Sequence, residues 1–290
     1  MHYVISGTTS GTGVRVIERL VAKVGRDNIT CLVRSTSDVT PLEPLNLRLH
    51  VGDVTEPESL ATLLNPGTVY VDMTHPKHYH KSLEAVMNAG VERAYFVTTT
   101  GIFSSYNQFS AIYKENEAKI RQSGLTYTIL RPSMIYGSLR DKNMNRLIRT
   151  LNRFPVFPLF GAGRSLMQPV FVDDLADGIV AAIGNPATEN QEYNLAGPIG
   201  IPYRRIVDTI VSQLGRHVTL LNVGLPLASG IVRFAQHVPG FPVTQEQVLR
   251  LLEDKVFDIS KAQADLGYKP RSFREGIALE VAEMKAAKVI

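Results

Sequence analysis

A glycine-rich turn near the start of the chain is the clearest chemical signal in the sequence. Residues 7–13, GTTSGTG, separate a short β-branched run, Tyr3–Ile5, from a segment with apolar residues at helical spacing, Val14–Val24. Small residues allow a backbone to approach a pyrophosphate, and the free N–H groups at a helix N-terminus bind the anion. The sequence therefore predicts a dinucleotide-binding turn that contains Gly7, Thr9, Ser10, Gly11, Thr12 and Gly13.

The spacing of this turn differs from the GxGxxG fingerprint of dinucleotide-binding proteins. It reads GxxSxxG, with Ser10 in the middle place and Gly11 beside it. Ser and Thr hydroxyl groups can donate further hydrogen bonds to phosphate oxygens. The alternative is a strand-to-helix turn that is rich in glycine for steric reasons alone.

The residue after the second expected strand bears on which dinucleotide is bound. Arg34 follows the apolar run Ile29–Val33 and lies about 20 positions after Gly13, the distance expected for the ribose-binding residue. An acidic residue here would bind the ribose hydroxyls of NAD, whereas an arginine suits the additional phosphate of NADP. We therefore predict NADP, with NAD as the alternative cofactor and a solvated surface side chain as the alternative for Arg34.

The third expected strand, Leu47–Val51, is followed by a candidate adenine site. Asp53 could accept a hydrogen bond from the adenine amino group, and Val54 could pack on the ring. The alternative is that Asp53 only caps the turn that follows it.

The elements that position these residues alternate between strands and helices. Further strands are expected at Thr68–Met73, Arg93–Val97 and Tyr127–Leu130, with helices at His80–Ala89 and Tyr113–Gln122 between them. Nearly unbroken apolar strands that alternate with helices indicate a parallel sheet covered on both faces. The expected fold is α/β, a Rossmann doubly wound parallel sheet with a smaller α/β substrate lobe.

The composition of the sequence changes after Arg131-Pro132, where Pro, Phe, Gly and basic residues become frequent. A strand at Gln168–Val172, a helix at Leu175–Ile183 and a strand at Glu192–Leu195 then return towards the sheet. We expect a dinucleotide-binding core over residues 1–135, to which residues 166–197 return. The substrate lobe is expected over 136–165 and 198–290.

Composition limits the classes of function. The chain has 290 residues, of which 44% are hydrophobic and 20% charged, and its net charge of +4 includes no run of five like charges. A nucleic-acid partner is therefore not expected. The sole cysteine, Cys31, excludes a disulfide framework, and no apolar stretch approaches the length of a membrane span. We expect a cytoplasmic protein with a small-molecule substrate and no membrane partner. A homodimer stays open as its assembly, because sequence alone does not separate an exposed apolar helix face from a core face.

Several segments in order resemble one family. They are GTTSGTG, CLVRS, GDVTEPESL, AGVERAYFVTTTGIF, SGLTYTILRPSMIYG, QPVFVDDLADGIVAAI, EYNLAGP and FDISKAQADLGYKPRSFREGI. Together they resemble the extended and atypical short-chain dehydrogenases/reductases, which include NmrA-like proteins and the NAD-dependent epimerase/dehydratase group. The resemblance covers nearly the whole chain and implies hydride transfer to or from a nicotinamide.

The resemblance also implies catalytic positions. The family uses a Ser or Thr, a Tyr and a Lys in a YxxxK motif, where the lysine charge lowers the tyrosine pKa. Thr99 stands at the Ser/Thr position, but the register set by Glu117 puts Phe109 at the Tyr position and Tyr113 at the Lys position. A shift of one residue would make Tyr113 and Lys114 the working pair. The alternative is a helix N-terminus without a catalytic role.

Two further segments match the family's nicotinamide side. Thr74 and His75 follow the fourth expected strand, at the carboxyl ends where ligands bind, and His75 could donate a proton near neutral pH. Pro132 and Met134 occupy the place of contacts to the nicotinamide face and carboxamide. A metal site is not expected beside the histidines, because no Cys or acidic partner lies nearby.

Three functions stay open. The first is an NADP-dependent oxidoreductase or epimerase that acts on a small organic substrate. The second is an NADP-sensing or scaffold protein without turnover, which the degraded YxxxK motif suggests. The third is a non-redox isomerase or cyclase on the same scaffold. Sugar nucleotides are disfavoured, because Met167-Gln168 stands where related enzymes place an arginine for the diphosphate, although Arg149 or Arg164 could substitute.

Overall fold

Seven parallel strands form the main sheet of the computed structural model, which describes residues 1–141, 143–224 and 253–290. Their order is β3-β2-β1-β4-β5-β6-β11, so the direction of strand addition reverses between β1 and β4. Ligands of such sheets bind at the carboxyl ends of the strands at this reversal. The strands span His2–Ser6 (β1), Ile29–Val33 (β2), Arg48–Val51 (β3), Thr68–Asp72 (β4), Arg93–Val97 (β5), Thr126–Pro132 (β6) and Gln191–Leu195 (β11).

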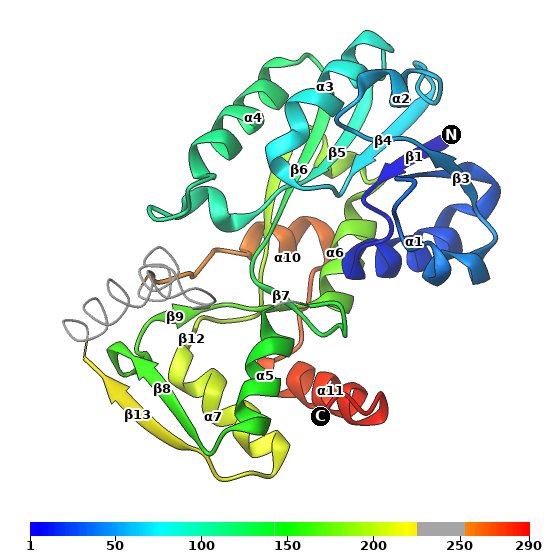
Figure 1. The fold of residues 1–290 in the computed structure, drawn as a ribbon. Helices are drawn as coiled ribbons and strands as arrows, with labels where there is room; N and C mark the ends of the chain where they lie inside the picture. Colours follow the sequence, from blue (N-terminus) through cyan, green and yellow to red (C-terminus); the bar gives the residue numbers. More distant parts are fainter. Residues whose placement is uncertain (142, 225–252) are drawn as a thin grey trace.

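Helices cover both faces of this sheet (Figure 1). One face packs against α1 (Gly11–Val24), α6 (Val172–Ala182) and α10 (Ser260–Leu266). The other packs against α2 (Pro57–Ala61), α3 (Tyr79–Asn88) and α4 (Ser110–Gln122). Strand side chains alternate between the two cores, as Ile5 and Val4 do in β1. The expected doubly wound α/β fold is confirmed.

The core beside α1 contains the lone cysteine. Cys31 lies in the middle of β2, is fully buried and forms no disulfide. Burial disfavours its thiolate and raises the pKa of the thiol to about 12.

The smaller lobe has a hydrophobic core of its own. Three helices build it, α5 (Met144–Arg153), α7 (Tyr203–Leu214) and α11 (Phe273–Ala286), beside the parallel pair β8 (Val156–Phe160) and β13 (Thr219–Val223). Two short pairs connect it to the main sheet. They are β7 (Ile135–Tyr136) with β10 (Val170–Phe171), and β9 (Leu166–Met167) with β12 (Ile201–Pro202).

A buried carboxyl group joins two parts of this lobe. Glu280 of α11 is fully buried, and the backbone N–H of Gly137 donates to its Oε2 at 3.2 Å. Within the described residues its Oε1 has no hydrogen-bond partner. Burial raises the pKa of Glu280 to about 8.

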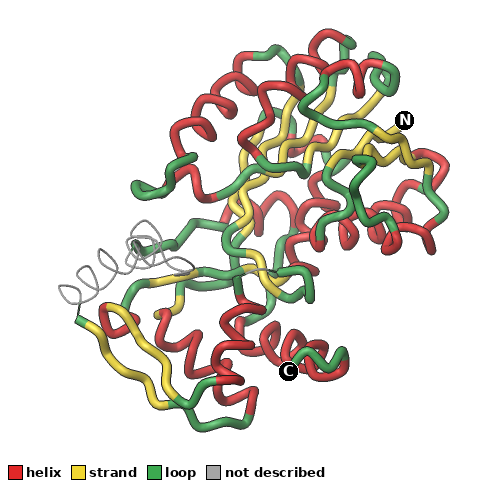
Figure 2. The backbone as a smooth tube through the Cα atoms, viewed as in Figure 1, coloured by secondary structure: helices red, strands yellow, loops and turns green. Residues whose placement is uncertain are grey.

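Figure 2 shows the strands of the main sheet with helices around them. Several boundaries of these elements differ from those expected. The segment Ile259–Tyr268, assigned to the lobe from sequence, packs with the main-sheet core. The strand expected at Gln168–Val172 is only two residues long and pairs with β7 rather than with the main sheet. Helix α4 begins three residues before Tyr113. None of the helices in the described part of the chain is long and apolar enough to cross a bilayer.

Candidate dinucleotide site

The glycine-rich turn joins β1 to α1 at the point where the strand order reverses. Gly7 has a φ of +82°, and a Cβ on it would lie 2.4 Å from the carbonyl oxygen of Met73, just after β4. A Cβ on Gly13 would lie 2.2 Å from the carbonyl oxygen of Gly7. The turn therefore packs too closely for side chains at either position.

Ser10 organises the start of α1. Its Oγ accepts from the N–H of Gly13 at 2.9 Å and donates to the carbonyl of Gly7 at 3.0 Å. The turn thus already uses the proton that we expected Ser10 to offer to phosphate. Gly11 and Thr12 occupy the first positions of α1, where a helix provides no partner for the N–H group, and Thr9 is half-buried beside them. These backbone N–H groups can bind a pyrophosphate.

Arg34 and Asp53 lie beyond the carboxyl ends of β2 and β3. Arg34 is exposed, and its backbone closes a turn with Ser37. Oδ1 of Asp53 accepts from the N–H and the hydroxyl of Thr55, both at 2.8 Å, so Asp53 does cap the following turn. The N–H of Thr55 lowers the pKa of Asp53, and the positive charge of Arg34 contributes. Val54 is buried among the residues that cover the sheet.

The loop after β4 is held by a buried carboxyl group. Oδ1 of Asp72 accepts from the N–H of Thr74 at 2.9 Å and from its hydroxyl at 2.6 Å. Burial raises the pKa of Asp72. The Tyr79 hydroxyl donates to the carbonyl of Val97 at 2.5 Å and so joins this loop to β5. These contacts fix the backbone from which His75 projects.

His75 is exposed and belongs to an aromatic cluster. Its ring centroid lies 5.9 Å from that of Phe109 and 6.0 Å from that of Tyr113. Its Nδ1 accepts from the N–H of Lys77 at 3.3 Å, which places the proton of the neutral ring on Nε2. Partial burial and the charge of Lys77 lower the pKa of His75. At neutral pH the ring can therefore donate one hydrogen bond through Nε2.

The structure brings Tyr113, but not its neighbour, to this cluster. Tyr113 is buried at 5% exposure, whereas Lys114 is exposed on the next position of α4, about 100° around the helix axis. Thr99 lies after β5, where its Oγ1 accepts from the N–H of Gly101 at 3.0 Å and caps a short 3₁₀ turn. The catalytic roles of these residues stay predictions.

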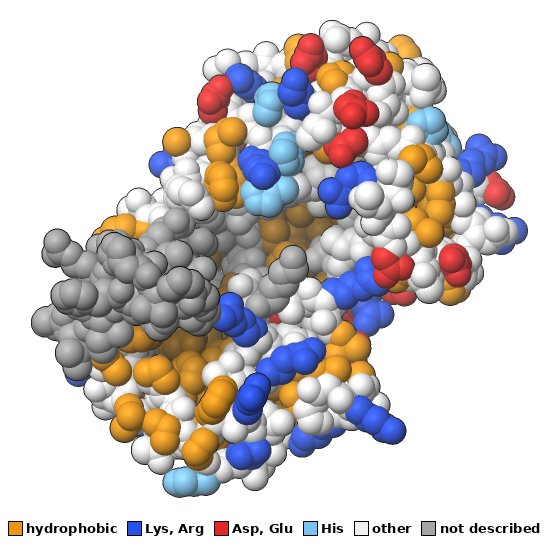
Figure 3. Space-filling model, viewed as in Figure 1, with side chains coloured by type: hydrophobic (Ala, Val, Ile, Leu, Met, Phe, Trp, Pro, Cys, Tyr) orange, Lys and Arg blue, Asp and Glu red, His pale blue; other side chains and the backbone are white. Residues whose placement is uncertain are grey.

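Pro132 and Met134 lie where the main sheet leads into the lobe. Pro132 ends β6, and its carbonyl accepts from the hydroxyl of Thr100 at 3.2 Å. The carbonyl of Met134 accepts from the N–H of Val170 at 2.9 Å. A hollow opens between the two parts of the molecule, with apolar side chains inside it and Lys or Arg side chains on both sides (Figure 3). Within the described ranges, no group of three His, Cys, Asp or Glu side chains could hold a metal ion.

Residues 7–186 match the NAD(P)H-binding family. The chain belongs to this family. The matched region begins at the first glycine of the turn, directly after β1, and includes β2 to β6 and α6. The fold is that of the short-chain dehydrogenase/reductase and NAD-dependent epimerase/dehydratase proteins, which confirms the resemblance seen in the sequence.

One curated protein and two solved structures illustrate what the chain is similar to. Subunit 9 of the mitochondrial NADH dehydrogenase 1 alpha subcomplex of Dictyostelium discoideum is 22% identical over 79% of this chain and 68% of its own length. A dTDP-glucose 4,6-dehydratase of Streptomyces venezuelae, solved with NAD bound, has a TM-score of 0.78 at 19% identity over 100% of this chain and 98% of its own. An NADPH-dependent quinone oxidoreductase of Escherichia coli has a TM-score of 0.76 at 21% identity over 95% and 98%.

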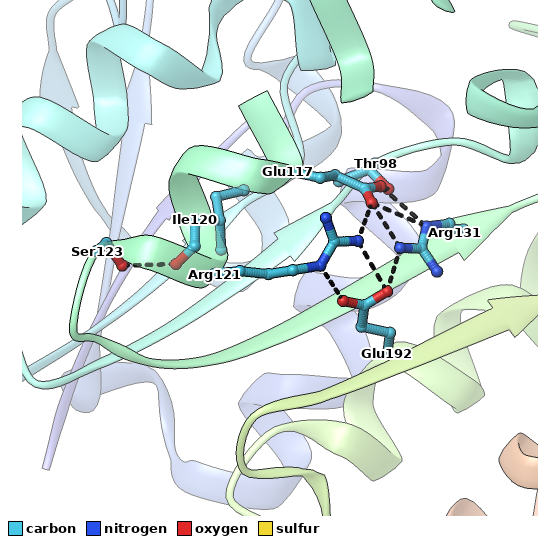
Figure 4. A network of polar contacts seen from close by, with 7 residues as sticks. All are labelled: Thr98, Glu117, Ile120, Arg121, Ser123, Arg131 and Glu192. Carbon is cyan, nitrogen blue, oxygen red and sulfur yellow. Dashed lines mark hydrogen bonds and ion pairs between the residues drawn. The ribbon is translucent and has the colours of Figure 1, made fainter. Parts of the chain in front are cut away.

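This NAD(P)H-binding protein also has a buried ion network that the sequence analysis did not identify (Figure 4). Glu117 of α4 is 1% exposed and accepts from Arg131 of β6 at 2.9 and 2.5 Å and from Thr98 at 2.9 Å. Arg121 donates to Glu117 at 3.0 Å and to Glu192 of β11 at 2.5 Å, and Arg131 also contacts Glu192. The network joins α4 to two strands beside Thr99. Its signal in the sequence was an arginine inside an apolar strand.

Arg140 is the second feature that the sequence analysis missed. It lies in the loop after β7, yet its Nη1 donates to the carbonyl of Thr9 at 3.0 Å and its Nη2 to Asp38 at 2.5 Å. Arg140 thus connects the lobe side of the molecule with the glycine-rich turn and with the loop after β2. A separation of 131 residues from Thr9 hid this contact from any local pattern.

Proposed function

We propose that the protein binds NADP at the glycine-rich turn and uses it for hydride transfer with a small organic carbonyl or hydroxyl compound. The observation that carries this proposal is the close packing of the turn at the reversal of strand order. Gly7 and Gly13 leave no space for side chains, and the N-terminus of α1 opens onto the same place. This arrangement suits a pyrophosphate between two backbone segments.

The end of β2 supports NADP over NAD. Arg34 lies there with an exposed side chain, and its positive charge contributes to the lowered pKa of Asp53 at the end of β3. A guanidinium group matches the geometry and charge of a phosphate, whereas NAD-binding proteins place a carboxylate at this position. The relatives include proteins described with each nucleotide, so the preference has to be measured.

Residues after β4 and in α4 would act at the reacting end. When bound, the nicotinamide would supply or accept the hydride. The Nε2–H of His75 can donate to a substrate oxygen and so stabilise the negative charge that develops on it. Phe109 and Tyr113 pack beside this ring and form an aromatic wall next to the reacting atoms.

Binding of NADP without turnover is the second candidate function. The exposed position of Lys114 favours it, because this side chain does not join the cluster of His75 and Tyr113. In the YxxxK arrangement a fixed lysine supports proton transfer by the tyrosine, and the exposed Lys114 does not occupy that place. Such a protein would use cofactor binding to change its association with a partner.

Titration of the purified protein tests the proposal. We expect the fluorescence of NADPH to increase when it binds the protein. We also expect NADPH to bind at least tenfold more tightly than NADH. Absorbance at the nicotinamide band, followed with a panel of aldehydes, ketones and quinones, then reports turnover. A protein that binds neither nucleotide contradicts the proposal at its first step, and binding without turnover on any class of carbonyl compound favours the second candidate.

Replacement of Tyr113 by phenylalanine separates the two functions. Tyr113→Phe keeps the aromatic packing against His75 and removes the hydroxyl. If that hydroxyl takes part in proton transfer, the turnover number falls by 10²–10⁴-fold while NADPH affinity stays the same. Tyr127→Phe, on β6 away from the carboxyl ends of the strands, is the matched control. Equal turnover in both variants would assign the proton transfer elsewhere, and His75→Asn is then the next variant.

A further inference from the structure

We propose that Arg140 is a specificity-determining residue that binds the 2′-phosphate of NADP together with Arg34. This inference rests on the proposed function, because it concerns the same dinucleotide site. It adds a residue from the loop after β7, outside the strand-turn-helix pattern by which such sites are recognised. The argument starts from the position of Arg140.

The loop that carries Arg140 lies directly against the glycine-rich turn. A Cβ on Gly11 would lie 2.8 Å from the Oγ of Ser138 and 3.9 Å from the Cβ of Arg140. Gly11 is the first residue of α1, so the loop that follows β7 lies beside the N-terminus of this helix. A ligand anion at that N-terminus would meet this loop as well as the turn.

The loop is built to hold Arg140 in place. Its N–H donates to the Oγ of Ser138 at 3.2 Å, and the N–H of Asp141 donates to the carbonyl of Ser138 at 2.9 Å. The carboxylate of Asp141 then accepts from the N–H groups of Met144 and Asn145 at 2.7 and 3.0 Å, which fixes the loop to α5. Arg140 therefore projects from a backbone that is hydrogen-bonded on both sides.

The two partners of Arg140 mark the adenosine side of the site. Thr9 belongs to the turn after β1, and Asp38 follows Arg34 in the loop after β2. In a doubly wound sheet these two loops enclose the ribose that carries the 2′-phosphate. Arg140 bridges the two loops, because one guanidinium nitrogen donates to the carbonyl of Thr9 and the other to the carboxylate of Asp38.

The pair with Asp38 is one that a phosphate can replace. Both side chains are about half exposed, at 43% for Arg140 and 56% for Asp38, so water screens their attraction. A phosphate carries nearly two negative charges and accepts two parallel hydrogen bonds from a guanidinium group. The 2′-phosphate would therefore displace Asp38 as the partner of Arg140, whereas NAD would leave the pair intact.

Two substitutions have opposite expected effects on the preference between nucleotides. Arg140→Gln removes the cation and leaves Asp38 uncompensated, so the Kd of NADPH should rise by roughly 10–100-fold and that of NADH by less than threefold. Asp38→Asn removes the competing carboxylate, so NADPH should bind several-fold more tightly, again with little change for NADH. The double variant should bind NADPH more tightly than Arg140→Gln alone.

A pair of smaller probes isolates the adenosine side. The compounds 2′,5′-ADP and 5′-AMP differ only in the 2′-phosphate, and Arg140→Gln should weaken binding of the first alone. Arg146→Gln is the matched control, because Arg146 is an exposed arginine of α5 in the same lobe and its loss changes the net charge equally. This control should change the affinity for NADPH by less than twofold.

The outcomes separate this inference from the proposed function. Wild-type protein that binds neither NADPH nor NADH overturns the proposed function and this inference with it. Wild-type protein that prefers NADPH, together with an Arg140→Gln variant that keeps the full preference, overturns only the role of Arg140. Equal loss of affinity for both nucleotides in Arg140→Gln also overturns it, because it would show that Arg140 only holds the lobe against the turn.

Discussion

Gly13 is the most crowded of the three glycines in the glycine-rich turn. A Cβ there would lie 2.2 Å from one carbonyl oxygen and 2.7 Å from another, both in the backbone of the turn itself. The corresponding atom on Gly11 would meet a side chain, which can rotate away. The three glycines therefore differ in what a substitution would disturb, although all three face the same expected ligand.

Gly13→Ala should damage the cofactor site more than the rest of the protein. The methyl group would push α1 away from the end of β1, so NADPH affinity should fall by at least tenfold and stability by roughly 1–3 kcal/mol. Isothermal titration and urea unfolding would measure the two effects. Gly67→Ala is the control, since its Cβ would approach only the side chain of Asn65, at 3.3 Å. Unchanged NADPH affinity in Gly13→Ala would contradict a cofactor site at this turn.

The sequence predicted the features of the site only where the interacting residues are close together in the chain. The glycine turn could be predicted because its strand, loop and helix are contiguous. The partners of individual hydroxyl and carboxyl groups could not. Ser10 and Thr74 use their hydroxyl protons within their own turns, and Asp53 caps the turn after it, an option that sequence left open. Arg140 escaped notice because its partners lie more than 100 residues away.

At the scale of elements, α4 owes its position to the ion network as much as to its apolar face. Its mean hydropathy is low, and its charged face would be unremarkable if it were exposed. Instead, Glu117 turns inward and meets Arg131 and Thr98 at the end of the sheet. The network thereby sets the rotation of α4 and, with it, the direction in which Tyr113 points.

Glu117→Ala should destabilise the protein strongly. It leaves the guanidinium of Arg131 buried at 8% exposure with its main partner gone, and such a loss costs about 3–5 kcal/mol. Urea unfolding at neutral pH would measure it. Glu115→Ala removes an exposed pair with Lys119 on the same helix and should cost far less, because water screens that pair. Similar costs for the two variants would mean that Glu192 alone compensates Arg131.

Periodicity predicted the elements themselves better than their ends. The strands of the main sheet were located because their apolar runs are buried on both faces. The start of α4 was placed too late, because Ser110, Ala111 and Ile112 give no apolar repeat that differs from the preceding loop. The sequence pattern after Val223 also predicts several helices, and residues 225–252 lie outside the described residues.

At the scale of the whole molecule, the chain leaves the main sheet after β6, builds much of the lobe and returns in α6 and β11. The order of elements made this excursion predictable. The later return of Ile259–Tyr268 to the main core was not, because its few apolar residues fit either core by pattern alone. The lobe and the sheet are therefore joined by several crossings of the chain.

Because of Glu280, the free energy of unfolding should depend on pH. Its pKa of about 8 lies above the ordinary value of 4.5, so the folded state holds a proton that the unfolded state releases between these pH values. Stability from this group is full below pH 4.5 and is lost as pH rises towards 8. Glu280→Gln should remove the dependence, so its stability relative to wild type should rise by roughly 2–4 kcal/mol between pH 5 and pH 8.5. Urea unfolding at both pH values measures this, and parallel curves would contradict it.

The buried thiol in β2 gives the protein a natural reporter. Thiolates, not thiols, attack disulfide reagents, and Cys31 is both fully enclosed and held with a pKa of about 12. Labelling can proceed only when β2 separates from its neighbours β1 and β3, which lead into the loops where we expect the nucleotide to bind. Because the chain has no second cysteine, the labelling rate records the opening of this sheet alone. Any nucleotide that closes the site would slow that reaction, so ligand occupancy can be followed in the unmodified protein.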